Sequence, residues 1–230
     1  VLCEKPVAFD YRDTLRAAAL AKANGLKTKL GFTFRYSPAM QYAKRLIDAF
    51  WPGPLTLILK RAAHISAAVS GGQDTVGLRA PSHPVAQALL DAFDARRAGH
   101  GGVAAPSANR FGHVSPTTAQ HVREEFGDSV YVLDGGACDV GIESTILDLS
   151  RGFPALLRPG RVTPVDIADV LGVAPRLPDG SDATAPRASG TLKAHYAPRT
   201  PLTLAAFEAL VPLLEGARNE SAHIALVART

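Results

Sequence analysis

Residues 101–119, with the sequence GGVAAPSANRFGHVSPTTA, hold the side chains of this chain that are best suited to chemistry. Ser107 and Asn109 offer a hydroxyl and an amide among small residues, where a ligand can approach the backbone closely. Ser115 and Pro116 are residue types typical of a helix N-cap and first turn, whose free N–H groups suit an anion such as phosphate. The run predicts a loop that contacts a nucleotide. It equally fits a strand–turn–helix connection in which Ser and Asn only cap backbone groups.

The elements that must position this loop alternate between short apolar strands and amphipathic helices, which predicts a layered α/β domain. We expect strands at residues 27–34, 55–60, 75–79, 103–105, 130–133 and 144–149. We expect helices at residues 10–24, 38–50, 84–94, 116–126 and 164–171. The runs LTLILK and STILDL are apolar enough to be central strands that are covered on both faces.

Composition excludes several classes of protein. No apolar run approaches the ~18 residues of a membrane span, so we expect no membrane partner. Cys3 and Cys138 lie far apart without a CxxC or Cys/His cluster, which argues against a disulfide scaffold or a metal site and favours a reducing cytoplasm. The net charge of +4 permits ATP, phosphate or RNA as partners. No P-loop, HExxH or GxSxG pattern occurs, so His83 and His195 are interpreted as structural.

Six motifs in order give the chain a family resemblance. PSANRFGHVSPT resembles the PSAN-x-SG-x-x-SPT stretch of the YrdC-type threonylcarbamoyl-AMP synthases. The other five matches are FWPGPLTLIL, DTVGLRAPSHP, DGG…GIESTILDL, LLRPG and SGTLKAHYAP. The resemblance runs from about residue 48 to the last residue printed. It implies a twisted mixed sheet with flanking helices, incomplete at its N-terminus, followed by a linker and a second α/β domain.

The resemblance also implies an activity. This family forms threonylcarbamoyl-AMP from L-threonine, bicarbonate and ATP, releases pyrophosphate, and so supplies the modification of an adenosine beside the tRNA anticodon. The implied protein is a nucleotidyltransferase that takes ATP, with Mg²⁺, as a substrate and needs no tightly bound cofactor. Its implied partners are tRNA and the complex that transfers the threonylcarbamoyl group.

Individual residues inherit roles from the matching motifs. The resemblance implies catalytic contacts from Ser107 and Asn109, ATP contacts from Thr75, Ser107, Ser115, Arg158 and Tyr196, and L-threonine contacts from Arg79 and Ser144. An arginine suits a carboxylate because its planar guanidinium binds both oxygens at once. Tyr196, on the linker, would fold back as a lid that excludes water. Each residue also has a plain structural interpretation, as a strand, packing or surface ion-pair residue.

Residues 1–47 resemble a different family, the NAD(P)-dependent Gfo/Idh/MocA dehydrogenases. The matching residues are Glu4-Lys5-Pro6, Gly25-Leu26, Gly31-Phe32 and Arg35-Tyr36. No Gly-rich dinucleotide fingerprint precedes them, so Lys5 has no site to serve and the segment is interpreted as scaffold. We therefore expect a foreign segment at 1–47, a partial catalytic domain at 48–173, a linker or lid at 174–201, and the start of a truncated α/β domain at 202–230.

The segment before Phe50 also lacks the Lys-x-Arg pair and Thr-rich loop of the synthases. Those cations would clamp the phosphates, and losing one such clamp costs about 10²–10³ in rate. We therefore expect impaired activity. Two alternatives stay open: a nucleotide- or RNA-binding module without catalysis, and a fragment of an NAD(P)-dependent oxidoreductase.

Overall fold

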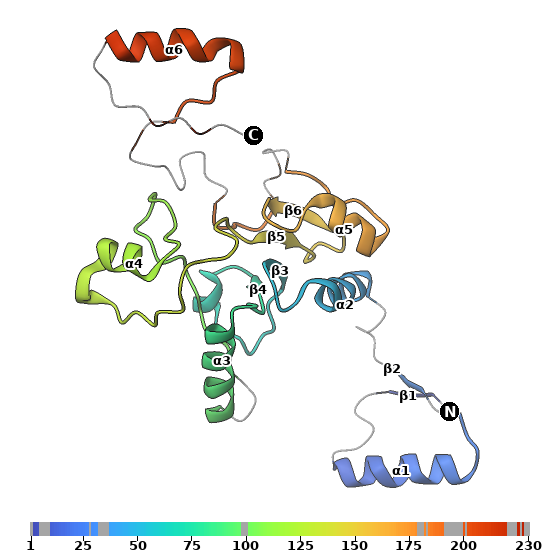
Figure 1. Cartoon of the computed structure of the whole chain (residues 1–230). Coiled ribbons are helices and arrows are strands. Elements are labelled where there is room, and N and C mark those ends of the chain that lie inside the picture. Colours follow the sequence, from blue (N-terminus) through green and yellow to red (C-terminus); the bar gives the residue numbers. More distant parts are fainter. Residues whose placement is uncertain are drawn as a thin grey trace.

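The computed structural model describes residues 2–4, 10–27, 29–31, 37–97, 101–178, 182, 184–190, 200, 202–219, 225 and 227. Lys5 and Tyr196 lie outside the described residues. Figure 1 shows the helices and strands in chain order. The helices are α1 (Tyr11–Ala23), α2 (Pro38–Phe50), α3 (Pro84–Arg96), α4 (Ala119–Phe126), α5 (Pro164–Leu171) and α6 (Phe207–Asn219), with short 3₁₀ turns η2 (Ala67–Ser70) and η3 (Gly127–Ser129). No helix in the described ranges is long and apolar enough to cross a membrane.

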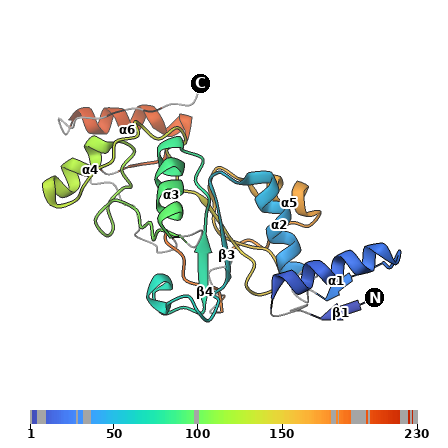
Figure 2. The same cartoon turned by 90° about the horizontal axis from the view of Figure 1, so that it is seen from below.

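Four strands form one mixed sheet in the order β4-β3-β5-β6. They are β3 (Leu55–Lys60), β4 (Thr75–Leu78), β5 (Thr145–Asp148) and β6 (Ala155–Arg158). Strand β3 is antiparallel to β4 and parallel to β5, and β5 is antiparallel to β6. The predicted mixed α/β sheet with flanking helices is confirmed, and the two apolar runs hold its central positions. Figure 2 shows α3 and α4 to the left of β4 and β3, with α2 and α5 to their right.

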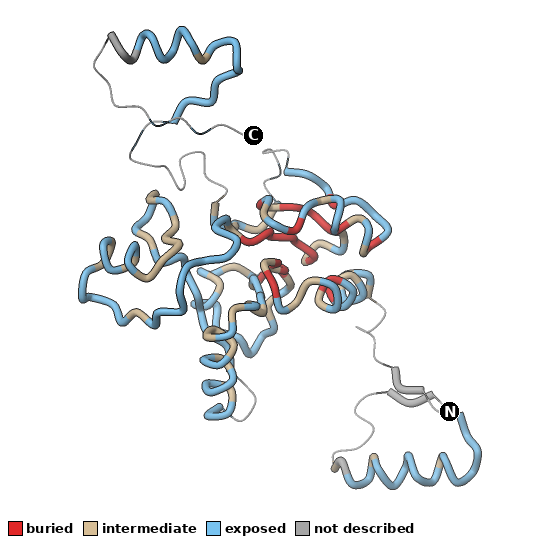
Figure 3. Tube along the Cα trace, viewed as in Figure 1, coloured by how far each residue is buried: buried red, intermediate tan, exposed pale blue. Residues whose placement is uncertain are grey.

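One face of the sheet carries the hydrophobic core. Successive strand residues point to opposite faces, and Leu55 and Leu57 of β3 share a face with Leu147 of β5. Helices α2 and α5 cover this face with Leu46 and Ile167, and all five of these side chains are fully buried. Figure 3 shows the buried residues gathered in the sheet, α2 and α5. Each such side chain contributes about 2 kcal/mol through burial, so this face anchors the sheet.

Local signals begin and end the helices that cover the core. Helix α5 begins with a capping box between Thr163 and Asp166 and ends at Gly172, whose φ of 74° is left-handed. Helix α2 begins with Pro38 at its first turn, and Arg45 Nη1 donates to Leu171 O at 3.1 Å, which joins the two helices. These starts agree with the sequence-based expectations because Pro and Thr act within a single turn.

Two strands predicted around the loop are wrong, and one predicted helix begins three residues later than expected. Residues 103–105 and 130–133 form no strand, and Val103 and Leu133 are about half exposed. The helix expected from Pro116 begins instead at Ala119, because Thr118 caps it by accepting from the His121 N–H at 3.2 Å. A short apolar run becomes a strand only where a neighbouring strand offers free backbone groups, which the sequence does not reveal.

The first 50 residues include a small unit of their own. Strands β1 (Leu2–Glu4) and β2 (Lys29–Gly31) pair in parallel, with α1 between them in sequence. Figure 1 shows this unit beyond α2, apart from the four-stranded sheet. Helix α2 nevertheless runs unbroken across the expected boundary at residue 47 and buries Ala43 and Leu46 in the core. Helix α2, much of which lies in the segment expected to be foreign, therefore packs against the apolar face of the sheet.

Leu46→Ala tests this integration. We expect the free energy of unfolding to fall by about 3 kcal/mol, because the lost methylene groups leave a cavity between α2 and the sheet. The exposed Leu20 of α1 provides the matched control, and Leu20→Ala should change stability by less than about 0.5 kcal/mol. Urea unfolding of both variants measures the difference. Equal losses would show that α2 contributes no more to the core than α1 does.

Candidate functional site: a hydroxyl–guanidinium network at one edge of the sheet

Thr56, Ser144 and Arg158 meet where β3 and β5 begin and β6 ends. Thr56 Oγ1 lies 3.1 Å from Ser144 Oγ. Arg158 donates from Nε to the Ser144 carbonyl at 3.0 Å and from Nη2 to Ser144 Oγ at 3.1 Å. Ser144 and Arg158 are both buried. A guanidinium out of water must satisfy its donors, so this pairing fixes the position of Arg158.

A bulge aims Arg158 onto this face. Arg158 pairs with Ile146, whereas Leu156 pairs with Leu147, so the register shifts by one residue between these pairs. Residues two apart on a regular strand share a face, but the shift sends Leu156 to the core side and Arg158 to the opposite side, beside Thr56. The bulge therefore places a cation on the polar face.

Glu143 connects this edge to the loop of residues 109–115. Its Oε1 accepts a hydrogen bond from Ser115 Oγ at 2.5 Å, and its Oε2 lies 3.4 Å from Arg158 Nη1. Ser115 Oγ also lies 3.4 Å from Asn109 Oδ1. Gly160 permits this packing, because a Cβ there would stand 2.5 Å from the Glu143 carbonyl oxygen. A chain of polar contacts thus runs from Asn109 to the sheet.

The loop is held to α4 by one carboxylate. Glu125 Oε1 accepts from the Arg110 N–H at 2.9 Å and lies 2.7 Å from His113 Nδ1. The Arg110 N–H, with a smaller contribution from His113, lowers the pKa of Glu125 below its ordinary value, against the opposing effect of burial. Asn109 Nδ2 donates to the carbonyls of Arg110 and His113 at 2.9 and 3.1 Å. These bonds set the direction of the Asn109 amide oxygen toward Ser115.

Residues 182 and 184–190 form a docked arm that contacts Arg158 and the segments around β4 and β5. Ser189 O accepts from Arg158 Nη1 at 3.1 Å. The Gln73 side chain accepts from the Arg187 N–H at 2.7 Å and donates to the Arg187 carbonyl at 3.2 Å, as a neighbouring strand would. Asp182 pairs with Arg151. The docked arm, which belongs to the segment predicted as a linker, therefore contacts the Arg158 network.

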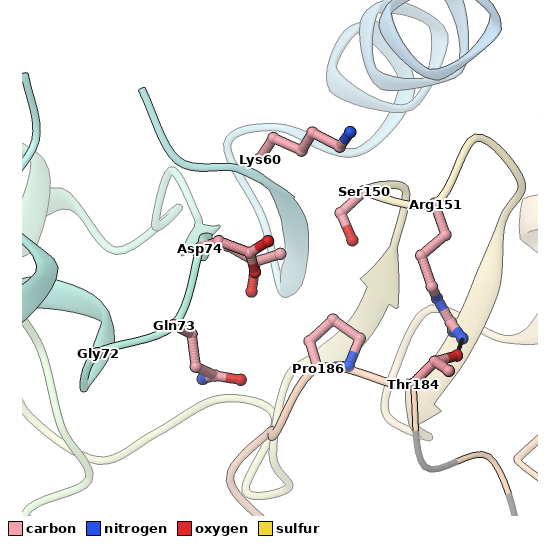
Figure 4. A pocket seen from close by; sticks show the side chains of 9 residues that line it. Lys60, Gly72, Gln73, Asp74, Ser150, Arg151, Thr184 and Pro186 are labelled. Atoms are coloured by element: carbon pink, nitrogen blue, oxygen red, sulfur yellow. Dashed lines mark hydrogen bonds between the residues drawn. The ribbon is translucent and has the colours of Figure 1, made fainter. Parts of the chain in front are cut away.

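A polar cavity of about 450 Å³ lies at the opposite edge of the sheet. Lys60 and Thr75, which pair across β3 and β4, line it together with Ser150, Arg151 and the arm residue Thr184. Figure 4 shows Arg151 reaching toward Thr184 while Lys60 and Asp74 approach from the other side. Behind it, Arg151 Nε lies 2.6 Å from Asp148 Oδ2, and Asp148 is fully buried. The cavity is separate from the Arg158 network.

The structure brings together four of the predicted site residues: Asn109, Ser115, Ser144 and Arg158. Arg79 directly follows Leu78, which pairs with Leu57, and so lies at the same edge as Thr56. Arg79 and Ser107 are exposed, and among the described residues neither forms a hydrogen bond or ion pair. Thr75 lies at the other edge, and Tyr196 is outside the described residues.

Sequence reasoning missed Glu143 and Thr56. Both lie in motifs that drew attention for other reasons, Glu143 directly before Ser144 and Thr56 in the apolar run of β3. For Thr56, the available signal was a polar side chain inside an otherwise apolar strand. For Glu143, it was an acidic residue directly before a candidate binding residue, Ser144. Neither signal says which partner the side chain meets.

Fold and site together define a mixed α/β domain with buried hydroxyl and guanidinium groups at a sheet edge. A family model described as "Telomere recombination" (Sua5/YciO/YrdC) matches residues 31–160. A second model, described as the C-terminal domain of threonylcarbamoyl-AMP synthase, matches residues 162–230. The chain belongs to the Sua5/YciO/YrdC family.

Named relatives agree with this assignment. The threonylcarbamoyl-AMP synthase of Pyrococcus abyssi is 41% identical over 160 residues, which is 68% of this chain and 45% of that protein. That of Bacillus subtilis is 41% identical over 172 residues, 73% of this chain and 47% of that protein. The chain thus spans about half the length of these relatives. The crystal structure of P. abyssi Sua5 complexed with L-threonine has a TM-score of 0.64 at 30% identity, covering 91% of this chain and 64% of that one.

These matches bear on the expected division of the chain. They do not support the resemblance of residues 1–47 to a dehydrogenase, and the first family match begins inside that segment, at residue 31. The second begins at residue 162, before the expected linker, and includes α5, which packs into the core. The proposed boundaries at residues 47, 173 and 201 stay predictions.

The docked arm gives a pH prediction. The Thr184 hydroxyl, and after it Arg151, lowers the pKa of Asp182 from 3.8 to about 2. A lowered folded-state pKa stabilises the fold above the ordinary value, and this stabilisation is lost as the pH falls toward 2. The stability difference between the wild type and Asp182→Asn should be full above about pH 5 and reduced to about half near pH 3.

Urea unfolding at a series of pH values measures this difference. Asp91→Asn removes the same charge from α3, where no described contact joins Asp91 to the arm, and serves as the matched control. A wild-type advantage that is the same at pH 6 and pH 3 would contradict the assigned pKa shift.

Proposed function

We propose that the chain takes part in the synthesis of threonylcarbamoyl-AMP from L-threonine, bicarbonate and ATP, with release of pyrophosphate. The observation that supports this most directly is the Asn109–Ser115–Glu143–Arg158–Ser144 network, which joins four residues that the family motifs single out. Membership of the family and the names of the relatives point to the same reaction.

The proposed roles follow from the donors at the network. Arg158 Nη1 and the Ser115 hydroxyl are suited to phosphate oxygens, and Asn109 and Ser107 would approach the reacting phosphorus from the loop. Positioning and electrostatic stabilisation carry most of such a reaction. The phosphates would then lie at the sheet edge where Arg158 and the loop of residues 109–115 meet.

Ser144 and Arg79 would hold the L-threonine carboxylate at the same edge. Thr75 lies four residues before Arg79 along β4, which corresponds to about 13 Å. An ATP contact at Thr75 therefore requires the nucleotide to extend along the sheet. Tyr196, further along the segment that carries the docked arm, would cover the nucleotide.

The remaining partners belong to the same proposal. Mg²⁺ would arrive with ATP as part of the substrate; within the described ranges no three His, Cys, Asp or Glu side chains group to hold a metal. tRNA and the threonylcarbamoyl-transfer complex would use the product, and we propose the cytoplasm as the place of action.

Arg158→Ala tests the assignment. ATP binding measured by calorimetry should weaken at least about tenfold, because a buried cation that meets the phosphate is lost. Arg158→Lys should recover only part of the ATP affinity, because an ammonium lacks the planar set of donors that meets both Ser144 and a phosphate. Arg161→Ala, at an exposed position three residues on, is the matched control and should bind as the wild type does.

Pyrophosphate release in the presence of ATP, L-threonine and bicarbonate separates the candidate functions. Release that depends on all three substrates supports the synthase. ATP binding without any release favours the non-catalytic nucleotide-binding module. A wild-type chain that neither binds ATP nor releases pyrophosphate would overturn the proposal.

A further inference from the structure

Ser144 accepts hydrogen bonds from two of the three guanidinium nitrogens of Arg158. Arg158 Nε donates to the Ser144 carbonyl, and Nη2 donates to the Ser144 hydroxyl. Its Nη1 donates to the Ser189 carbonyl at 3.1 Å and lies 3.4 Å from Glu143 Oε2. A phosphate that pairs with Nη1 therefore meets a carboxylate that already stands there.

Ser115 is occupied by the same carboxylate. A serine hydroxyl has one proton to donate, and Ser115 Oγ lies 2.5 Å from Glu143 Oε1. The two oxygens of Glu143 thus meet the two groups proposed to bind phosphate, one oxygen on each. A carboxylate and a phosphate are both bound by hydroxyl and guanidinium donors, so Glu143 fills the place of an anionic ligand.

We propose that Glu143 is a built-in competitor for this anion site, which phosphate must displace, so that Glu143 sets the affinity for the nucleotide. The inference rests on the proposed function and adds a residue to which no role has been assigned. In the ligand-free protein the carboxylate satisfies Arg158 and holds Ser115 in place. When phosphate enters, like charges repel at short range and Glu143 moves out toward solvent.

The surroundings of Glu143 allow that movement. Its side chain is 31% exposed, whereas that of Arg158 is 10% exposed. Glu143 follows the exposed residues 135–142, which include the left-handed Gly141, while Arg158 lies inside a strand. The carboxylate can leave at the cost of one hydrogen bond and one ion pair, and the guanidinium remains held by Ser144.

Glu143→Gln tests the proposal, since glutamine keeps the size and the acceptor for Ser115 but removes the charge. We expect ATP and inorganic pyrophosphate, each titrated alone by calorimetry, to bind about tenfold more tightly than to the wild type. Glu143→Ala should also bind more tightly. Glu124→Gln, which removes the same charge from the exposed side of α4, should bind as the wild type does.

The direction of the change separates competition from a structural role. If Glu143 merely braced Arg158 and Ser115, its loss would loosen both groups and weaken binding. Unchanged or weaker binding to Glu143→Gln, by a wild-type chain that does bind ATP, overturns the competitor role and leaves the proposed function standing. Absence of ATP and pyrophosphate binding in the wild type and both Glu143 variants overturns the proposed function and this inference together.

Discussion

The buried guanidinium of Arg158 is the constraint on which the polar side of this molecule depends. A cation removed from water is tolerated only where its donors are satisfied, and breaking such a pairing costs several kcal/mol. Ser144, directly before β5, accepts from Nε and Nη2, while Nη1 meets the Ser189 carbonyl and the Glu143 carboxylate. The loop before β5, the docked arm and the end of β6 are therefore fixed relative to one another by one side chain.

Alternation along β3 and β5 separates this polar site from the core. Leu55, Leu57 and Leu147 face α2 and α5, while Thr56 and its neighbours face the other way. The bulge in β6 is needed to keep Arg158 on the polar face, because a regular strand would have sent it to the side of Leu156. The same core that supports the site also takes in α2, which lies within the family match that begins at residue 31.

Much of the fold could be predicted from the sequence because its signals are local. Helix α5 was predicted with its observed bounds, since a Thr–Pro start and a glycine stop act within one turn. The two central strands were recognisable because their runs LTLILK and STILDL are rich in apolar residues. The strands expected at 103–105 and 130–133, and the cap expected at Ser115, were wrong because each depended on partners that only the folded chain supplies.

The sequence by itself determined the family, the mixed α/β class and most of the chemical groups at the site. The order of the motifs and the residue types can be read from it without knowing any distance. Only the tertiary structure decided which of those groups meet. It joined Asn109, Ser115, Ser144 and Arg158 through Glu143, whose role no local pattern announces. It also placed Thr75 at the other edge, because strand direction and register are set by pairing between distant segments.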